Sequence, residues 1–294
     1  MNKPKDEPGL QTILSHCGRN LEASGGYVNV PPYEGSTILH DDMEDLFGRV
    51  DNHLYGDGTA QTYGTDGGPT HEAFYDAMNK LEGGAGTWAF STGLAGCTIP
   101  MMAFLKTGDH MLVTDSVYGP TRQFCEVLLK NFGVEAEFYE PTIEAGIEKL
   151  IRPNTRLIYM ESPGTHTFEM QDVPAIAAVA RKYNIVTMID NTYATPLNFQ
   201  PLKHGVDVVV HSATKYICGH SDVLMSTVTC NEKNWKQVRD VCKMTGQYAS
   251  AQSVYLGLRG LRTLKVRLDA VGVHTRKVVD WLLKREEVKK VIWP

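Results

Sequence analysis

The sequence predicts an α/β protein with a mostly parallel sheet covered by helices, and two features carry this prediction. From about residue 70 onward, short apolar runs bounded by turn residues alternate with helical stretches. The runs place β-branched and other apolar residues at successive positions, as strands buried on both faces do. The composition, with 42% hydrophobic and 21% charged residues, is that of an ordinary globular protein.

The expected elements follow one another along the chain. Strands are expected at residues 87–90, 111–113, 136–139, 157–160, 185–189 and 208–210. Helices are expected at residues 70–81, 93–105, 120–131 and 173–183, the first of them ended by Gly83 and Gly84. The first 65 residues are rich in Gly, Pro, Asp and Asn, which predicts an extended arm suited to lie on a partner subunit.

Charge and composition argue against several classes of function. The formal net charge of −5, without any Lys/Arg run, gives no electrostatic basis for binding nucleic acid or an anionic membrane. No apolar run approaches the ~18 residues that span a bilayer, and the polar start lacks a signal-peptide stretch. The six cysteines are scattered without a C-x-x-C pair, as is typical of reduced thiols. We therefore expect a cytoplasmic protein.

Chemically useful side chains follow the expected strands. In open α/β sheets, ligands bind at the carboxyl ends of the strands. An acid, an aromatic ring, small hydroxyls and a lysine are therefore expected to converge on one edge of the sheet. They lie in the segments Ser91–Gly93, Asp115–Tyr118, Glu161–Pro163, Asp190–Thr192 and His211–Lys215.

This combination meets the needs of pyridoxal phosphate. The aldehyde of that cofactor forms a Schiff base with a lysine amine, for which Lys215 is the candidate. Its ring nitrogen must stay protonated, and Asp190 could hold that proton. Tyr118 could stack on the ring face. Each residue alone has an ordinary structural explanation, so the prediction rests on their occurrence at one edge.

A phosphate cradle is expected beside them. Residues 91–96 (STGLAG) form a turn from a strand into a helix, where free N–H groups and the positive helix end favour an anion. Glycine there lets the backbone approach closely. Ser212 and Thr214, which flank the lysine, can add hydroxyl donors.

Two longer stretches resemble a known enzyme family. Residues 190–196 (DNTYATP) and 211–222 (HSATKYICGHSD) are similar to the signature of the Cys/Met-metabolism PLP enzymes. That family includes cystathionine β-lyase, cystathionine γ-synthase, cystathionine γ-lyase and methionine γ-lyase. The resemblance runs from about Tyr27 to the last residue and implies the type I PLP (aspartate aminotransferase-like) fold, usually assembled as a homotetramer. It implies an arm at 1–65, a PLP-binding domain at 66–261 and the beginning of a C-terminal domain at 262–294.

The resemblance implies a role for each candidate residue. Lys215 would be the Schiff-base lysine, Asp190 the pyridinium partner and Tyr118 the stacking ring. Catalytic roles are implied for Lys215, Tyr118 and Tyr63. The implied phosphate ligands are Gly93, Leu94, Ser212, Thr214 and, from a neighbouring subunit, Tyr63.

Within the family, two stretches resemble the β-lyases. They are residues 161–165 (ESPGT), where γ-acting enzymes tend to continue with Asn-Pro, and residues 244–264. The implied reaction is β-elimination of L-cystathionine to homocysteine, pyruvate and ammonia, a step of transsulfuration and methionine biosynthesis. A γ-acting relative, which would give 2-oxobutyrate and cysteine, stays open as the alternative.

Two features depart from the family pattern. Members commonly carry Tyr-x-Arg in the arm, but here Tyr63 is followed by Gly64 and Thr65. Without that guanidinium we expect the phosphate to be held less tightly, by ~1–3 kcal/mol. The family also continues well beyond Pro294 and there supplies the arginine for the substrate carboxylate. We therefore expect a truncated chain, and an inactive remnant that at most binds the cofactor is the alternative of another class.

Two other interpretations, a metal site and a dinucleotide-binding fold, have less support in the sequence. His204, His211, Cys218 and His220 lie close in sequence but have no H-E-x-x-H or C-x-x-C framework, so we expect no metal site. The stretch Gly56-Asp57-Gly58 lacks the rest of the G-x-G-x-x-G fingerprint of dinucleotide-binding folds.

Overall fold

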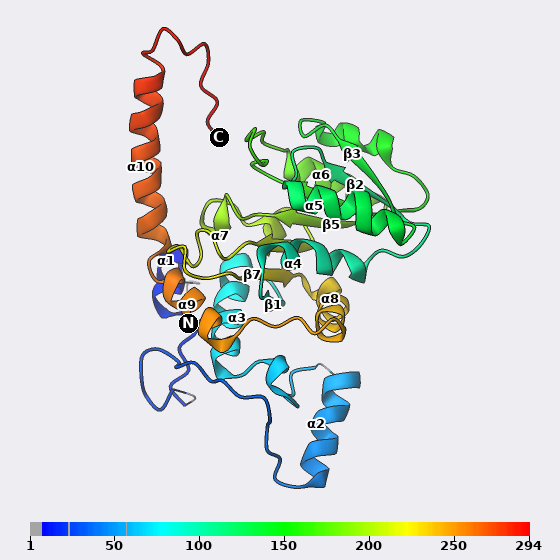
Figure 1. The fold of residues 1–294 in the computed structure, drawn as a ribbon, viewed down its shortest axis with the longest axis vertical. Helices are drawn as coiled ribbons and strands as arrows, with labels where there is room; N and C mark the ends of the chain where they lie inside the picture. The colour runs from blue at the N-terminus through cyan, green and yellow to red at the C-terminus, as the bar shows by residue number, and fades with distance from the viewer. Residues whose placement is uncertain (1–7, 23, 57) are drawn as a thin grey trace, which may run out of the picture.

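A seven-stranded sheet forms the centre of the protein, with helices on both of its faces (Figure 1). The computed structural model describes residues 8–22, 24–56 and 58–294. The start of the chain (residues 1–7) and Asp57 of the stretch 56–58 lie outside the described residues. The strands are β1 (Gly86–Phe90), β2 (His110–Thr114), β3 (Glu135–Tyr139), β4 (Thr155–Glu161), β5 (Val186–Asp190), β6 (Val208–His211) and β7 (Ser226–Cys230).

The sheet is mostly parallel, as the sequence predicts. Its strand order is β1-β7-β6-β5-β4-β2-β3, and β7 runs antiparallel to both of its neighbours. All other pairs are parallel, so the carboxyl ends of the six remaining strands lie at one edge of the sheet.

Strand β7 was not among the expected strands. Three of its five residues carry hydroxyl groups, which hides the apolar signal. Val228 and Cys230 face one hydrophobic cluster, whereas the intervening Thr229 faces the other side and its hydroxyl lies 2.8 Å from that of Thr87. The period-two alternation of a strand is therefore present, but in side chains that also suit a loop.

The expected helices are present, with two changes of type. The described helices are α1 (Leu10–His16), α2 (Met43–Tyr55), α3 (Pro69–Glu82), α4 (Gly93–Thr98), α5 (Gly119–Gln123), α6 (Val173–Lys182), α7 (Thr195–Asn198), α8 (Glu232–Met244), α9 (Ala251–Leu261) and α10 (Leu264–Leu282). The helix expected at 93–105 becomes a 3₁₀ helix, η2 (Ile99–Ala103), because Pro100 has no N–H to continue the α-helical ladder. The helix expected at 120–131 continues from α5 into a π-helical turn, η3 (Phe124–Leu129).

Short 3₁₀ helices occur between the main elements. They are η1 (Gly64–Asp66), η4 (Glu144–Leu150) and η5 (Pro201–His204).

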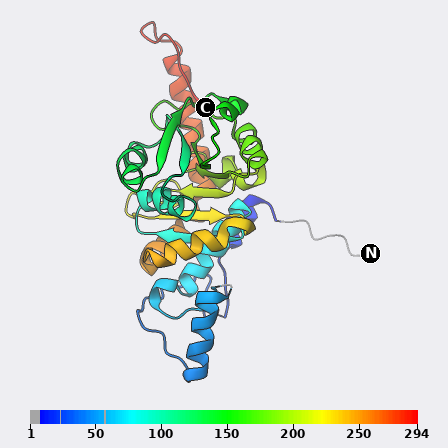
Figure 2. The ribbon, with the colours of Figure 1, turned by 90° about the vertical axis from the view of Figure 1, so that its right-hand side faces the viewer.

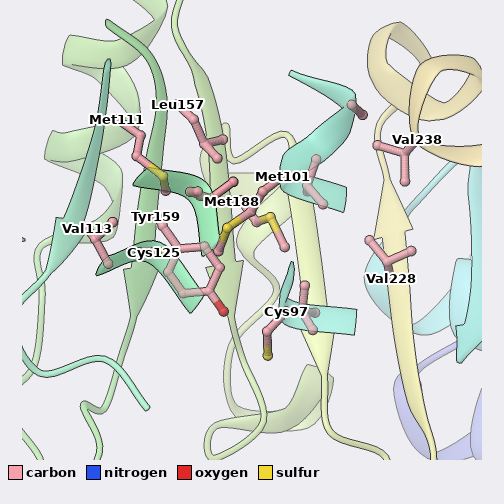
Figure 3. Close-up of a cluster of buried hydrophobic side chains, with 14 of the residues drawn as sticks. Cys97, Met101, Met111, Val113, Cys125, Leu157, Tyr159, Met188, Val228 and Val238 are labelled. Atoms are coloured by element: carbon pink, nitrogen blue, oxygen red, sulfur yellow. The ribbon is translucent and has the colours of Figure 1, made fainter. Parts of the chain in front are cut away.

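Buried side chains fix both faces of the sheet. One cluster joins Phe90, Tyr159, Met188 and their neighbours with α4, η3 and α8 (Figure 3). A second cluster packs α1, α3 and α9 against the β1 and β7 side, and a third packs α6 against the middle strands. Because the strands are held from both sides, their carboxyl ends have fixed positions.

Helices α2 and α10 are much more exposed than the sheet. Helix α2 has no buried residue, and α10 has only Leu264 buried and stands away from the sheet in Figure 1. The expected arm is not uniform, because Leu14, Cys17 and Val30 lie in the second cluster. The domain limits at residues 65 and 261 stay a prediction. Within the described residues, no helix has the length and apolar content needed to cross a membrane.

Candidate active site

Two carboxylates end neighbouring strands at the carboxyl edge of the sheet. Glu161 is the last residue of β4 and Asp190 the last residue of β5, and their Cα atoms are partners across this parallel pair. Both side chains are buried, at 7% and 8% exposure. Paired residues of adjacent strands point to the same face, so the two carboxylates share one environment.

Asp190 is a buried carboxylate without a cation. Its Oδ1 accepts a hydrogen bond from the backbone N–H of Thr192 (2.9 Å), and its Oδ2 accepts one from Sγ of Cys97 (3.5 Å). Burial, and then the charge of Asp190, raise the pKa of the Cys97 thiol well above its usual range. Figure 3 shows Cys97 within the apolar cluster beneath the edge. Since Asp190 has no ion pair among the described residues, a protonated ring nitrogen would complete its surroundings.

The lysine segment follows β6 and is tied to the loop after β5. The N–H of Ser212 donates to Oγ1 of Thr192 (2.7 Å), and the N–H of Lys215 donates to the carbonyl of Ser212 (3.0 Å). The Lys215 side chain is exposed. It lines a hollow of about 760 Å³ between the segment 214–224 and the first turns of α10. Asp190 and Tyr118 do not line this hollow, which opens on the α10 side of the lysine.

The expected phosphate turn lies against the lysine segment. Gly93 is the first residue of α4, and a Cβ atom at this position would lie 2.6 Å from Oγ of Ser212. A larger residue here would displace the Ser212 hydroxyl, so glycine keeps the two segments close, as a phosphate cradle between them would require. Leu94, the next residue of α4, is 38% exposed. The structure thus brings Gly93, Leu94 and Ser212 together at the edge.

Thr214 is placed differently from the other expected phosphate ligands. Its hydroxyl donates to the carbonyl of Met225 (3.1 Å) and accepts from the N–H of the same residue (2.9 Å). Thr214 would therefore donate to a phosphate only after giving up its bond to the Met225 carbonyl.

Tyr118 stands at the same edge, after β2. Its ring is 45% exposed, and its backbone N–H donates to Oε2 of Glu161 (2.8 Å). The other oxygen of Glu161 is hydrogen-bonded to the hydroxyl of Thr165. Burial, and then the charge of Asp190, raise the pKa of Glu161 to about 8. The aromatic residue expected over the ring is thus attached, through its backbone, to a buried acid.

Tyr63 is not brought to this edge within the chain. It lies in the segment between α2 and α3, pairs with Thr37 in an isolated β-bridge, and donates its N–H to Asp66 (3.1 Å). Its side chain is 51% exposed. This placement leaves its expected role towards a neighbouring subunit as a prediction.

Residues that were not among the sequence-predicted ligands also shape the edge. Rings from three successive loops form a row, with centroids 5.2 Å apart for Phe168 and Tyr193 and 6.2 Å apart for Tyr193 and Tyr216. Arg267 on α10 donates to the carbonyls of Tyr216 (2.6 Å) and Gly260 (2.8 Å), and so connects α10 to the lysine segment. In the sequence, the three aromatic residues each occur a few residues after a strand (β4, β5 or β6), and this position could have predicted the row.

The histidines and cysteines near the lysine have other partners. Nε2 of His211 lies 2.5 Å from Oε1 of Glu82 in a fully buried pair, and Nδ1 of His220 lies 2.7 Å from the carbonyl of Cys218. His204 stacks on a phenylalanine ring. All six cysteines are free and buried. In the part of the chain that the structure describes, no group of three or more His, Cys, Asp or Glu residues could hold a metal ion.

Comparison with known proteins decides the family. Residues 11–294 match the model of the Cys/Met metabolism PLP-dependent enzymes. The chain belongs to this family. It is 44% identical over 286 residues to a Rhizobium johnstonii protein, a match that covers 97% of this chain and 70% of that protein. It is 38% identical over 287 residues to a cystathionine beta-lyase of Escherichia coli, covering 97% of this chain and 72% of that enzyme.

A solved structure of the family has the same fold. The cystathionine gamma-lyase of Lactobacillus plantarum, solved with L-serine, superposes with a TM-score of 0.87 at 30% identity, over 96% of this chain and 71% of that one. The type I fold and the dependence on pyridoxal phosphate expected from the sequence are therefore confirmed.

The described residues fit this cofactor. A buried carboxylate without a cation, a glycine turn in contact with a serine, and an accessible lysine lie in segments at the carboxyl ends of β5, β1 and β6. These are the three fixed requirements of the ring nitrogen, the phosphate and the aldehyde.

Proposed function

We propose that this chain is a carbon–sulfur lyase that breaks the Cβ–S bond of L-cystathionine and releases homocysteine, pyruvate and ammonia. The observation that carries the proposal is the buried, cation-free Asp190 beside the segment that bears Lys215. The family membership and the β-lyase name of the Escherichia coli relative support it. The segment 161–165, which resembles the β-lyases, points the same way.

We assign the binding roles as the sequence predicts them. Asp190 would hold the proton on the ring nitrogen, and Tyr118 would cover one face of the ring. The amide of Gly93 and the hydroxyl of Ser212 would bind the phosphate. Leu94 and Thr214 would contribute beside them, the latter after release from Met225. We also expect a homo-oligomer, as the family resemblance implies, in which Tyr63 would reach the phosphate of a neighbouring subunit.

Lys215 would carry out the proton transfers. When bound, pyridoxal phosphate supplies an electron sink for the charge that develops at the substrate Cα. The free amine of Lys215 would take the Cα proton and deliver a proton to the departing sulfur. One water is consumed as the remaining three-carbon fragment becomes pyruvate and ammonia.

The products of cystathionine cleavage test this proposal. We would assay pyruvate and homocysteine with the unaltered chain, with Lys215→Ala and with the matched control Lys203→Ala, which removes an exposed lysine of η5. The proposal predicts pyruvate from the unaltered chain and the control, and none above background from Lys215→Ala.

Two results would overturn it in different ways. Formation of 2-oxobutyrate and cysteine would establish the γ-acting alternative, which the structural similarity to a gamma-lyase favours. Absence of any product from a folded, cofactor-loaded chain would contradict lyase activity and support an inactive remnant.

A further inference from the structure

Glu161 joins two loops at the edge of the candidate site. The loop after β2 carries Tyr118, whose N–H donates to Oε2 of Glu161 over 2.8 Å. The loop that follows β4 carries Thr165, whose hydroxyl is hydrogen-bonded to Oε1 of the same carboxyl group. Glu161 is buried, with 7% of its surface exposed.

The two loops also contact each other directly. The N–H of Thr165 donates to the carbonyl of Ser116 (2.8 Å), two residues before Tyr118. A Cβ atom on Gly164 would collide with the Ser116 side chain, so the loops pack as closely as glycine allows. Since β2 and β4 are adjacent in the sheet, these contacts connect the loops that follow two neighbouring strands.

Among the described residues, the hydrogen bonds of Tyr118 are made by its backbone. This residue precedes α5, a helix of five residues, and its side chain is 45% exposed. Its carbonyl accepts from the N–H of Arg122, which sets the start of the helix and not its position relative to β4. The bond to Glu161 is the polar link between the Tyr118 backbone and the end of β4.

We propose that Glu161 is a positioning residue which, together with Thr165, holds Tyr118 in place over the cofactor ring. The inference rests on the proposed function, in which Tyr118 stacks on pyridoxal phosphate. Glu161 itself need not touch the cofactor or the substrate.

The link survives a change in the protonation of Glu161. An ionised carboxylate accepts from both the Tyr118 N–H and the Thr165 hydroxyl. A protonated carboxyl group still accepts from the N–H on one oxygen and can donate from the other to Oγ1 of Thr165. A hydroxyl at position 165 is therefore the requirement, which selects the substitution for the test.

The test is a double-mutant cycle on cofactor affinity. Binding of pyridoxal phosphate is followed by visible absorption in the unaltered chain, Thr165→Val, Tyr118→Ala and the double variant, with Thr165→Ser as the matched control that keeps a hydroxyl. We expect Thr165→Val to weaken binding by up to about tenfold, as for loss of one ordinary hydrogen bond, and Thr165→Ser by less than about twofold. Once Tyr118→Ala has removed the ring, Thr165→Val should weaken binding little further, because coupled residues give non-additive effects.

A merely structural role would give a different pattern. If Thr165→Val weakens binding by the same factor with and without the Tyr118 ring, or not at all, the positioning role is wrong. Thermal unfolding identifies any variant that is not folded at the assay temperature, and in that case Thr165→Ala, which also removes the hydroxyl, replaces Thr165→Val in the cycle. The proposed function fails separately, if the unaltered chain binds no cofactor or if Lys215→Ala leaves its absorption unchanged.

Discussion

The carboxyl edge of the sheet and the two outlying helices, α2 and α10, differ in how much of them is buried. At the edge, Asp190 and the lysine segment are fixed by strands that are buried on both faces. Helix α2 buries no residue and α10 buries only Leu264. Figure 2, turned by 90° from Figure 1, shows both helices projecting from the body that the sheet forms. Site residues on strands are therefore placed by this chain alone, whereas Tyr63 depends on a neighbour for its proposed role.

The largest effect is expected at the edge, from Asp190→Asn. The amide cannot hold the ring nitrogen in its protonated form, so kcat/KM for cystathionine should fall about 10²–10³-fold, as when one preorganised electrostatic group is lost. Steady-state kinetics would measure this fall. The control Asp76→Asn alters an exposed carboxylate of α3 and should change little. Equal effects of the two substitutions would show that Asp190 does not hold the proton on the ring nitrogen.

The contrast in packing predicts the next effect, on stability. Leu157→Ala would open a cavity beneath β4 and lower the free energy of unfolding by about 2–5 kcal/mol. Val273→Ala, at a position of α10 that is 56% exposed, should change it by less than about 0.5 kcal/mol. Urea denaturation would measure both values. A Val273 effect as large as that of Leu157 would show that α10 is packed in solution.

The raised pKa of Glu161, at the carboxyl edge, predicts that the free energy of unfolding depends on pH. A carboxyl group whose pKa rises from 4.5 to about 8 on folding stabilises the fold fully below pH 4.5, and this contribution is lost as the pH rises to about 8. The free energy of unfolding of the cofactor-free chain should therefore decline over this window. In Glu161→Gln the decline should be smaller, by about 1–3 kcal/mol. Parallel pH profiles of the two proteins would contradict the raised pKa.

The smallest effect on stability is expected in the arm, from Tyr63→Phe. The hydroxyl belongs to a half-exposed side chain, so the free energy of unfolding should change by less than about 0.5 kcal/mol. Cofactor affinity of the oligomer should nevertheless fall by about 1 kcal/mol, because one donor to the phosphate is lost. Light scattering would establish the oligomer, and absorption titration the affinity. An unchanged affinity in the oligomer would show that Tyr63 does not reach the phosphate.

Much of the fold could be predicted from the sequence because buried parallel strands are continuous apolar runs. The six other strands were expected on this basis, whereas β7 was not, since its serine and two threonines interrupt the apolar run. The helix expected at 93–105 changes type at Pro100, for a reason visible in the sequence but at a position that only the packing sets.

The candidate site was predictable to the extent that it lies at strand ends. Asp190, Lys215 and Gly93 were expected at one edge, and the structure places them there. The link from Glu161 to Tyr118 depends on which strands are neighbours, and the bond of Thr214 to Met225 depends on how one loop folds back on another. Neither arrangement has a local signature in the sequence.

Chemical trapping of the cofactor tests the central claim most directly. The chain would be loaded with pyridoxal phosphate, reduced with borohydride to fix any link to a lysine, digested, and analysed by mass spectrometry. We predict the added phosphopyridoxyl mass on the peptide that contains Lys215 and on no other. A label on another lysine, or none on a folded chain, would contradict the assignment of Lys215 and with it the proposed site.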